Sequence, residues 1–308
     1  VQTPTTTGFS SRYSNLGMTS NTGVEITLES RNIVRKKFEW NTTLTMSHNR
    51  QMVHDIGNED YVSALSSAGN TSYMMYGYKS GYPLNSLWGF QNMGVIKSSE
   101  EIKRNEQTHS WVTPTKPSTG ELKYADQNGD GVLDDNDLIY LGNSDPILHG
   151  GLQNNFHIGN FKISFYFAYS LGGKIYNYSQ LYMGGSYSTN QYRFMLDAWH
   201  PVKRPDSDIP RAGVDDMLPP SDFQVYDASY IRLKNASISY NFDFKKSKKQ
   251  VVKGLTLTLT GDNLWLWSRY IGYDPDVSTE SDGSVMRRVD LGAYPKARMV
   301  ILKANIKF

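Results

Sequence analysis

Hydrophobic and polar residues alternate along much of this chain with a period of two, which is the pattern of β-strands with one apolar face. In residues 161–171, FKISFYFAYSL, the odd-numbered positions are apolar or aromatic, and the even-numbered positions are mostly polar or small. Six further segments follow the same period: 24–31, 38–48, 147–158, 236–242, 255–261 and 298–308. The pattern therefore predicts an all-β chain with about seven long strands.

The connections between these segments differ greatly in length. Residues 158–160 form a tight turn, and two basic turns lie at 31–37 and 245–250, whereas 49–146 and 173–227 are long polar stretches. Short turns at one end and long loops at the other are typical of antiparallel outer-membrane β-barrels. A last strand ending at the periplasmic edge would put all three turns on that side and both long stretches outside. A soluble β-sandwich also alternates apolar and polar residues, so it stays open as the alternative.

Two helices are expected within the long stretches. Residues 98–107 begin with Ser98 and have Glu101 three positions later, which is a capping box. Residues 190–200 place Tyr192, Met195, Leu196 and Trp199 at helical spacing, which predicts a helix that packs within a loop.

Composition narrows the possible functions of the 308-residue chain. Aromatic residues make up 13%, although only 38% of residues are hydrophobic and the mean hydropathy is -0.53, a balance that suits half-exposed β-structure. The net charge of +2 gives no reason to expect a nucleic-acid partner. Because the chain has no cysteine, disulfides, thiolate zinc sites and cysteine nucleophiles are excluded.

The loop DQNGDGVLDDND, residues 126–137, predicts a calcium site. Calcium binds six to eight oxygens, which a twelve-residue loop supplies from positions 1, 3, 5, 7, 9 and 12. Those positions hold Asp126, Asn128, Asp130, Val132 through its backbone carbonyl, Asp134 and Asp137. Gly131 falls where the loop must turn sharply. The segments on either side read as extended rather than helical, and the alternative is an acidic surface turn without metal.

Together with this loop, several stretches resemble the C-terminal part of SusC-like TonB-dependent transporters of Bacteroidetes. The similar stretches occur in order along nearly the whole chain: NTGVEITLES, FEWNTTLTMSHNR, GYPLNSLWGFQNMGVIKSSEEI, GELKYADQNGDGVLDDNDLIYLGNSDP, DASYIRLKNASISYNF, GDNLWLWSRYIGYDPDV and LGAYPKARMVILKANIKF. The resemblance implies the C-terminal part of a large, 22-stranded transmembrane barrel. Seven strands do not close such a barrel, since open edges in lipid would leave backbone groups unsatisfied.

The resemblance implies an organisation and a function. Residues 1–308 would be the C-terminal portion of the barrel, with an extracellular loop region at 49–146 that holds a structural calcium loop, and with the plug and N-terminal regions outside this chain. The whole protein would import a glycan or peptide across the Gram-negative outer membrane. Its partners would be TonB, a SusD-like surface lipoprotein, the remainder of the barrel and outer-membrane lipid. The competing function is a secreted or surface-attached, calcium-stabilised β-sandwich that binds carbohydrate.

No recognisable motif supports an enzyme. The six histidines show no metal-ligand spacing, and there is no nucleophile elbow, P-loop or dinucleotide-binding motif. Aromatic residues of the long stretches are expected to pack rather than to bind a ligand: Tyr73, Tyr76, Tyr78, Trp88, Trp111, Tyr182, Tyr187 and Trp199. The sequence does not single out any substrate-binding residue.

Overall fold

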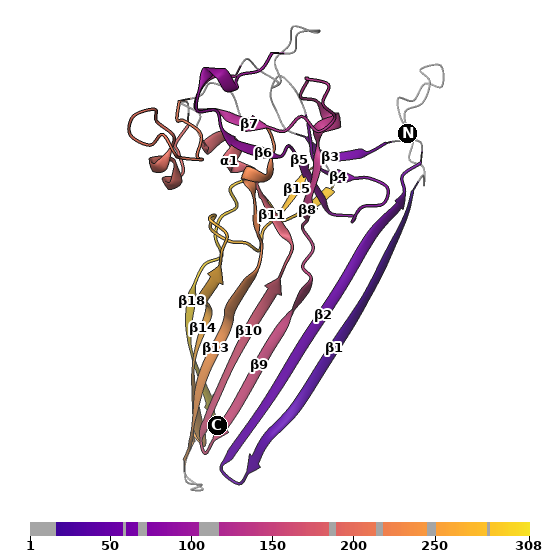
Figure 1. Ribbon diagram of the computed structural model, residues 1–308. Helices are drawn as coiled ribbons and strands as arrows, with labels where there is room; N and C mark the ends of the chain where they lie inside the picture. Colours follow the sequence, from indigo (N-terminus) through magenta and orange to yellow (C-terminus); the bar gives the residue numbers. More distant parts are fainter. Residues whose placement is uncertain are drawn as a thin grey trace, which may run out of the picture.

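The computed structural model describes residues 17–57, 60–66, 73–104, 117–184, 189–213, 218–244, 251–281 and 284–308. Within these ranges the chain forms a tall sheet with a smaller folded region at one end (Figure 1). We call the sheet the wall and the smaller region, built from the connections between its strands, the cap.

The wall has seven strands in sequence order, and each is antiparallel to its neighbours. The strands are β1 (Met18–Arg35), β2 (Phe38–Asp55), β9 (Leu148–Ile158), β10 (Phe161–Leu171), β13 (Tyr230–Asp243), β14 (Gly254–Ser268) and β18 (Met299–Lys307). All seven predicted strands are confirmed. Because they lie in one continuous sheet rather than in two stacked sheets, the sandwich alternative is wrong.

The strands are longer than the alternation indicated at several ends. β2 continues to Asp55, so the connection expected from residue 49 begins only at residue 56. β13 begins at Tyr230 and β14 ends at Ser268, since a bulge between Leu233 and Asn235 lets the pairing continue where strict alternation fails.

The described residues of the cap form four small sheets, so these parts of the long stretches are folded rather than simple loops. Their strands are β3 (Val62–Ser66), β4 (Met74–Tyr78), β5 (Ser86–Gly89), β6 (Asn92–Val95), β7 (Leu122–Tyr124), β8 (Ile139–Asn143), β11 (Lys174–Asn177), β12 (Val225–Asp227), β15 (Ser278–Ser281), β16 (Ser284–Arg287) and β17 (Val289–Asp290). A core of fully buried side chains, including Tyr76, Leu87 and Phe90, holds these elements together.

The helical elements of the cap are shorter than predicted. Residues 98–107 were expected to form a helix, but the structure has one 3₁₀ turn, η2 (Ser99–Glu101), and residues 105–107 lie outside the described ranges. The Ser98–Glu101 capping box is present at its start. Residues 190–200 form the 3₁₀ helix η4 (Arg193–Asp197) instead of an α-helix. Two further 3₁₀ turns are η3 (Asp135–Asp137) and η5 (Asp222–Gln224), and the one described α-helix is α1 (Ser179–Met183).

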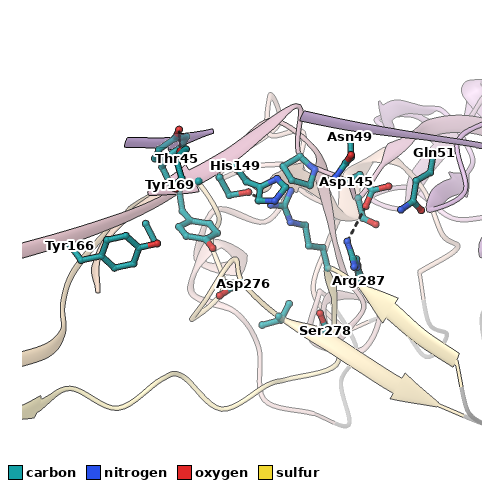
Figure 2. Close-up of a pocket in the computed structure, with 18 residues that line it drawn as sticks. Thr45, Asn49, Gln51, Asp145, His149, Tyr166, Tyr169, Asp276, Ser278 and Arg287 are labelled. Carbon is teal, nitrogen blue, oxygen red and sulfur yellow. Dashed lines mark hydrogen bonds and ion pairs between the residues drawn. The ribbon is translucent and has the colours of Figure 1, made fainter. Parts of the chain in front are cut away.

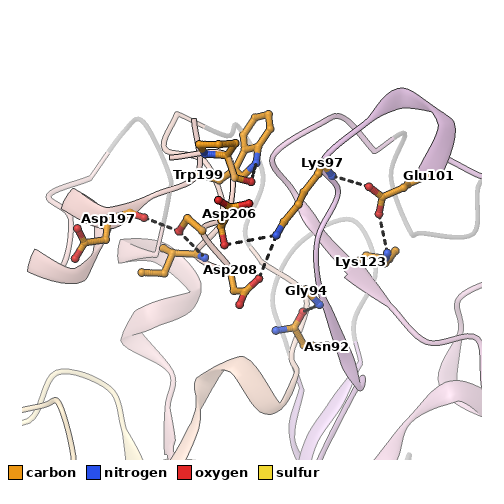
Figure 3. A network of polar contacts seen from close by, with 12 residues as sticks. Asn92, Gly94, Lys97, Glu101, Lys123, Asp197, Trp199, Asp206 and Asp208 are labelled. Atoms are coloured by element: carbon orange, nitrogen blue, oxygen red, sulfur yellow. Dashed lines mark hydrogen bonds and ion pairs between the residues drawn. The ribbon is translucent and has the colours of Figure 1, made fainter. Parts of the chain in front are cut away.

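Charged side chains tie distant segments of the cap together (Figure 3). The Lys97 ammonium lies 3.7 Å from Asp208, and Lys123 forms an ion pair of 2.7 Å with Glu101. Hydrogen bonds from Lys123 and from the backbone hold the pKa of the half-buried Glu101 carboxyl below its usual value. Within the described residues, no helix is long and apolar enough to cross a membrane.

Candidate functional site: a polar cavity between wall and cap

The register of the wall sorts side chains into one polar face and one apolar face. On the polar face, Ser164 lies opposite Ser237 with 2.8 Å between the hydroxyls, and Ser239 lies 2.8 Å from Thr258. Next along this face, the Asn235 amide donates to Asp262 at 2.6 Å. Each pair joins neighbouring strands, so the polar face is a continuous hydrogen-bonding surface.

The opposite face carries an apolar and aromatic surface. The rings of Trp40 and Phe156 stack at 5.6 Å, and Phe156 lies 5.8 Å from Phe165, so aromatic contacts run across three strands. Asn154 is a polar exception on this face. Its side-chain oxygen accepts hydrogen bonds from the Trp40 indole at 2.9 Å and the Thr42 hydroxyl at 2.7 Å, so the amide oxygen is satisfied in an apolar setting.

A cavity of about 550 Å³ lies where the polar face of the wall meets the cap (Figure 2). It is lined from the wall mainly by Thr45, Asn49, Gln51, His149, Tyr166 and Ser170, and from the cap by Asp145, Asp276, Ser278, Arg287 and Arg288. Gly151 leaves space for the Tyr166 ring that lines the cavity, because a Cβ at position 151 would lie 2.3 Å from this ring.

A buried hydrogen-bonded chain in the cap ends on a carboxylate that lines the cavity, that of Asp145. Tyr76 donates to the Asn85 side-chain oxygen at 2.6 Å, and the Asn85 amide nitrogen lies 2.9 and 3.0 Å from the two oxygens of Asp145. Burial raises the pKa of Tyr76 to about 12, which keeps this hydroxyl a donor. The Arg287 guanidinium lies 3.6 Å from the Asp145 carboxylate.

Arg288 fixes the cap to the top of the wall. Its guanidinium donates to the Gly172 carbonyl at 2.9 Å and to the Ser170 hydroxyl at 2.6 Å. The residue has φ +58°, a left-handed conformation that costs energy for a side chain other than glycine. Burial lowers the pKa of the Arg288 guanidinium. The conformation turns the chain between β16 and β17, and so places two consecutive arginines at the cavity.

A second ion pair also joins the wall to the cap. Arg232 of β13 and Asp274 of the cap lie 2.6 Å apart, and both side chains are almost completely buried. A paired charge is tolerated at such a position, whereas either charge alone is not.

The structure places the six predicted calcium ligands in a single loop between β7 and β8, so the extended flanks are confirmed. The two Asp126 oxygens accept hydrogen bonds from the backbone of Gly129 and Gly131, and Gly131 has φ +79°. Asp137 is fully buried and accepts from the Gln127 and Asp134 backbone. In the described parts of the chain, no group of three or more His, Asp or Glu side chains is gathered as a metal site.

Sequence reasoning did not find the cavity. Tyr166 and His149 carried a usable signal, since each is a large side chain on the polar side of a predicted strand. Arg287 and Asp145 carried none, because they come from separate cap segments that only the fold brings together. Of the aromatic residues expected to pack, four are buried in the cap: Tyr73, Tyr76, Trp88 and Trp199. Trp111 and Tyr187 lie outside the described residues.

Comparisons with known proteins agree with this architecture. The chain is 33% identical over 320 residues to TonB-dependent receptor P26 of Formosa agariphila, and the match covers 100% of this chain and 31% of that protein. It is 26% identical over 319 residues to TonB-dependent receptor SusC of Bacteroides thetaiotaomicron, covering 100% of this chain and 28% of that protein. No protein-family model matches the chain.

Solved structures show the same fold. The structure of the RagAB peptide transporter matches with a TM-score of 0.75 and 20% identity, over 100% of this chain and 31% of that one. The RagAB peptide importer in its 'open-open' state matches with a TM-score of 0.70 and 22% identity. The wall is therefore part of an antiparallel β-barrel, which the described residues do not close.

These matches define a class: the chain is part of a TonB-dependent receptor. Within that class it is SusC-like, as its sequence stretches indicated. The chain spans about a third of the length of the curated relatives it matches, with 31% of the first one covered.

Proposed function

We propose that the full-length protein imports an oligosaccharide or peptide nutrient across the outer membrane, energised through TonB and assisted by a SusD-like surface lipoprotein. The observation that supports this most strongly is the polar cavity between wall and cap. A cavity lined by amides, hydroxyls, a histidine and charged groups offers hydrogen bonds to a polar ligand at the end of the wall where the cap is built.

The two faces of the wall support the same proposal. Lipid requires a surface without unsatisfied polar groups, which the aromatic face provides, whereas a transport path requires water and hydrogen bonds, which the opposite face provides. The apolar face is accordingly assigned to lipid and the polar face to the barrel interior. The named relatives are receptors and transporters, which agrees with a role without catalysis.

Uptake by cells tests the import proposal. A strain lacking the full-length gene should fail to accumulate a labelled oligomeric nutrient that the parent strain takes up, and removal of TonB should have the same effect. Affinity purification of the full-length protein should recover a surface lipoprotein in stoichiometric amount. Undiminished uptake of every nutrient tested in both deletion strains would contradict import.

We further propose that the loop at 126–137 binds one structural calcium ion. The donor chemistry fits, because the loop offers only oxygen ligands and Gly131 adopts the left-handed turn that such loops need at their sixth position. The ligands would be Asp126, Asn128, Asp130, Val132 through its carbonyl, Asp134 and Asp137. The ion would offset the repulsion among four carboxylates and hold β7 and β8 in place.

Metal analysis of the full-length protein, purified without chelator, tests this site. One calcium per chain is expected, and the double variant Asp126→Asn, Asp130→Asn should lose it. Asp135→Asn is the matched control, since this carboxylate lies in the same loop but outside the ligand positions. Full calcium occupancy in the double variant would contradict the assignment.

A further inference from the structure

The charged side chains that line the cavity differ in how fully the protein satisfies them. Arg288 donates to Gly172 and Ser170, and Asp276 is paired with Lys296. Asp145 is held by both contacts from the Asn85 amide. These three charges therefore already have close partners within the described chain.

Arg287 is different. Its side chain is 60% exposed, and its ion pair with Asp145 spans 3.6 Å. Charge-assisted hydrogen bonds between arginine and a carboxylate normally measure about 2.7–2.9 Å, so this contact is loose. A guanidinium has five N–H donors in a planar fork. Arg287 thus presents a positive group to the cavity, and Asp145 does not satisfy all of its N–H donors.

The backbone under Arg287 is nevertheless fixed. Arg287 pairs with Ser278 in the β15–β16 hairpin, and the next residue, Arg288, donates its N–H to Val277 at 2.9 Å. The Arg288 carbonyl accepts from the Tyr176 N–H at 2.9 Å. A loosely paired guanidinium on an anchored backbone is suited to binding, because little ordering of the main chain is needed when a ligand arrives.

We propose that Arg287 recognises an anionic group of the imported ligand, a carboxylate or a sulfate, inside the cavity. The proposal rests on the import function above and specifies the class of ligand. The planar fork of arginine matches two oxygens of such a group. Asn49, Gln51 and His149 lie around the same space and offer hydrogen bonds to neutral parts of the ligand (Figure 2). Asp145 acts as the internal anion that the ligand displaces from Arg287.

Because Asp145 competes with the ligand for Arg287, substitutions of the two residues should change the affinity for an anion in opposite directions. Arg287→Gln should weaken binding of an anion about tenfold or more, since a charge-assisted bond is lost. Asp145→Asn should strengthen binding, because the amide oxygen can keep one of the two hydrogen bonds from Asn85, whereas the neutral amide no longer neutralises Arg287. If the ion pair had only a structural role, both substitutions would change the affinity in the same direction.

Equilibrium binding to the full-length protein in detergent tests the proposal with two pairs of probes. One pair is tetragalacturonate and its methyl ester; the other is tetra-aspartate and tetra-asparagine. An acidic sugar and an acidic peptide both carry carboxylates, so comparing the two pairs shows which of these two kinds of ligand the cavity binds. At least one acidic probe should bind about tenfold tighter than its neutral counterpart, with Arg287→Gln removing and Asp145→Asn increasing that preference.

The contrary results are equally defined. Equal affinity for acidic and neutral probes, binding of neither acidic probe, or a preference that survives in Arg287→Gln would overturn the anion site. Arg287→Lys adds a check on geometry, since it keeps the charge but loses the fork, and an intermediate affinity is expected. Import is judged separately by TonB-dependent uptake in cells, so a neutral nutrient would remove this proposal and leave import standing.

Discussion

The wall and the cap stabilise themselves in different ways, although both are built from β-strands. Apolar side chains of the wall stay partly exposed along one face, for example Leu259 at 46% and Ile238 at 42%, whereas Leu87 and Phe90 of the cap are completely buried. The wall relies on a hydrogen-bond ladder and a surface that suits lipid, and the cap relies on a core of the kind found in water-soluble domains. The comparison shows that strands of one chain can keep their apolar side chains partly exposed, as in the wall, or bury them in a core, as in the cap.

The largest expected effect lies at the joint between the two regions. Replacing Asp274 by alanine leaves Arg232 buried without its counter-charge, which should cost about 3–5 kcal/mol. Denaturant unfolding of the full-length protein measures this loss, and hydrogen exchange should show the cap opening before the wall. Asp276→Ala removes a more exposed ion pair two residues away and should cost less than about 1 kcal/mol. Equal costs for both variants would mean that the buried pair does not join the regions.

A substitution that leaves a void in the cap core should destabilise the cap and not the wall. Leu87→Ala removes a fully buried side chain and should destabilise the cap by about 2–5 kcal/mol. Hydrogen exchange should speed up in β4, β5 and β8, while β10 and β13 of the wall keep their protection. A uniform increase across both regions would show that wall and cap unfold as a single unit, contrary to this prediction.

The two faces of the wall should respond differently to a charge. Arginine at Phe165 would lie in the lipid-facing surface and should cost about 2–4 kcal/mol. Arginine at the neighbouring Ser164 would lie on the polar face beside Ser237 and should cost much less. Refolding equilibria of the full-length variants into lipid vesicles provide the measurement. A larger penalty at Ser164 than at Phe165 would reverse the assignment of the faces.

The sequence predicted the wall well and the cap poorly, for a physical reason. A long strand with one apolar face repeats its signal every second residue, so the alternation in residues 161–171 was enough to place β10. Cap strands such as β5 are four residues long and buried throughout, so they carry no alternation. The cavity was harder still, because Arg287 and Asp145 lie 142 positions apart and meet only after folding.

For the candidate calcium loop, local features could be predicted from the sequence, whereas burial could not. Its ligand spacing and its left-handed glycine could be predicted because both follow from a local turn. The burial of Asp137 could not, since it depends on the surrounding cap.

The central claim is that the wall has one face in lipid and one in water, and cysteine labelling tests it most directly. The chain has no cysteine, so single cysteines can be placed at successive positions 163–168 of β10, after replacement of any cysteine elsewhere in the full-length protein. A water-soluble maleimide should label positions 164, 166 and 168 and spare 163, 165 and 167, and a lipid-soluble reagent should give the opposite pattern. Labelling without a period of two, or with the two patterns exchanged, would contradict the account.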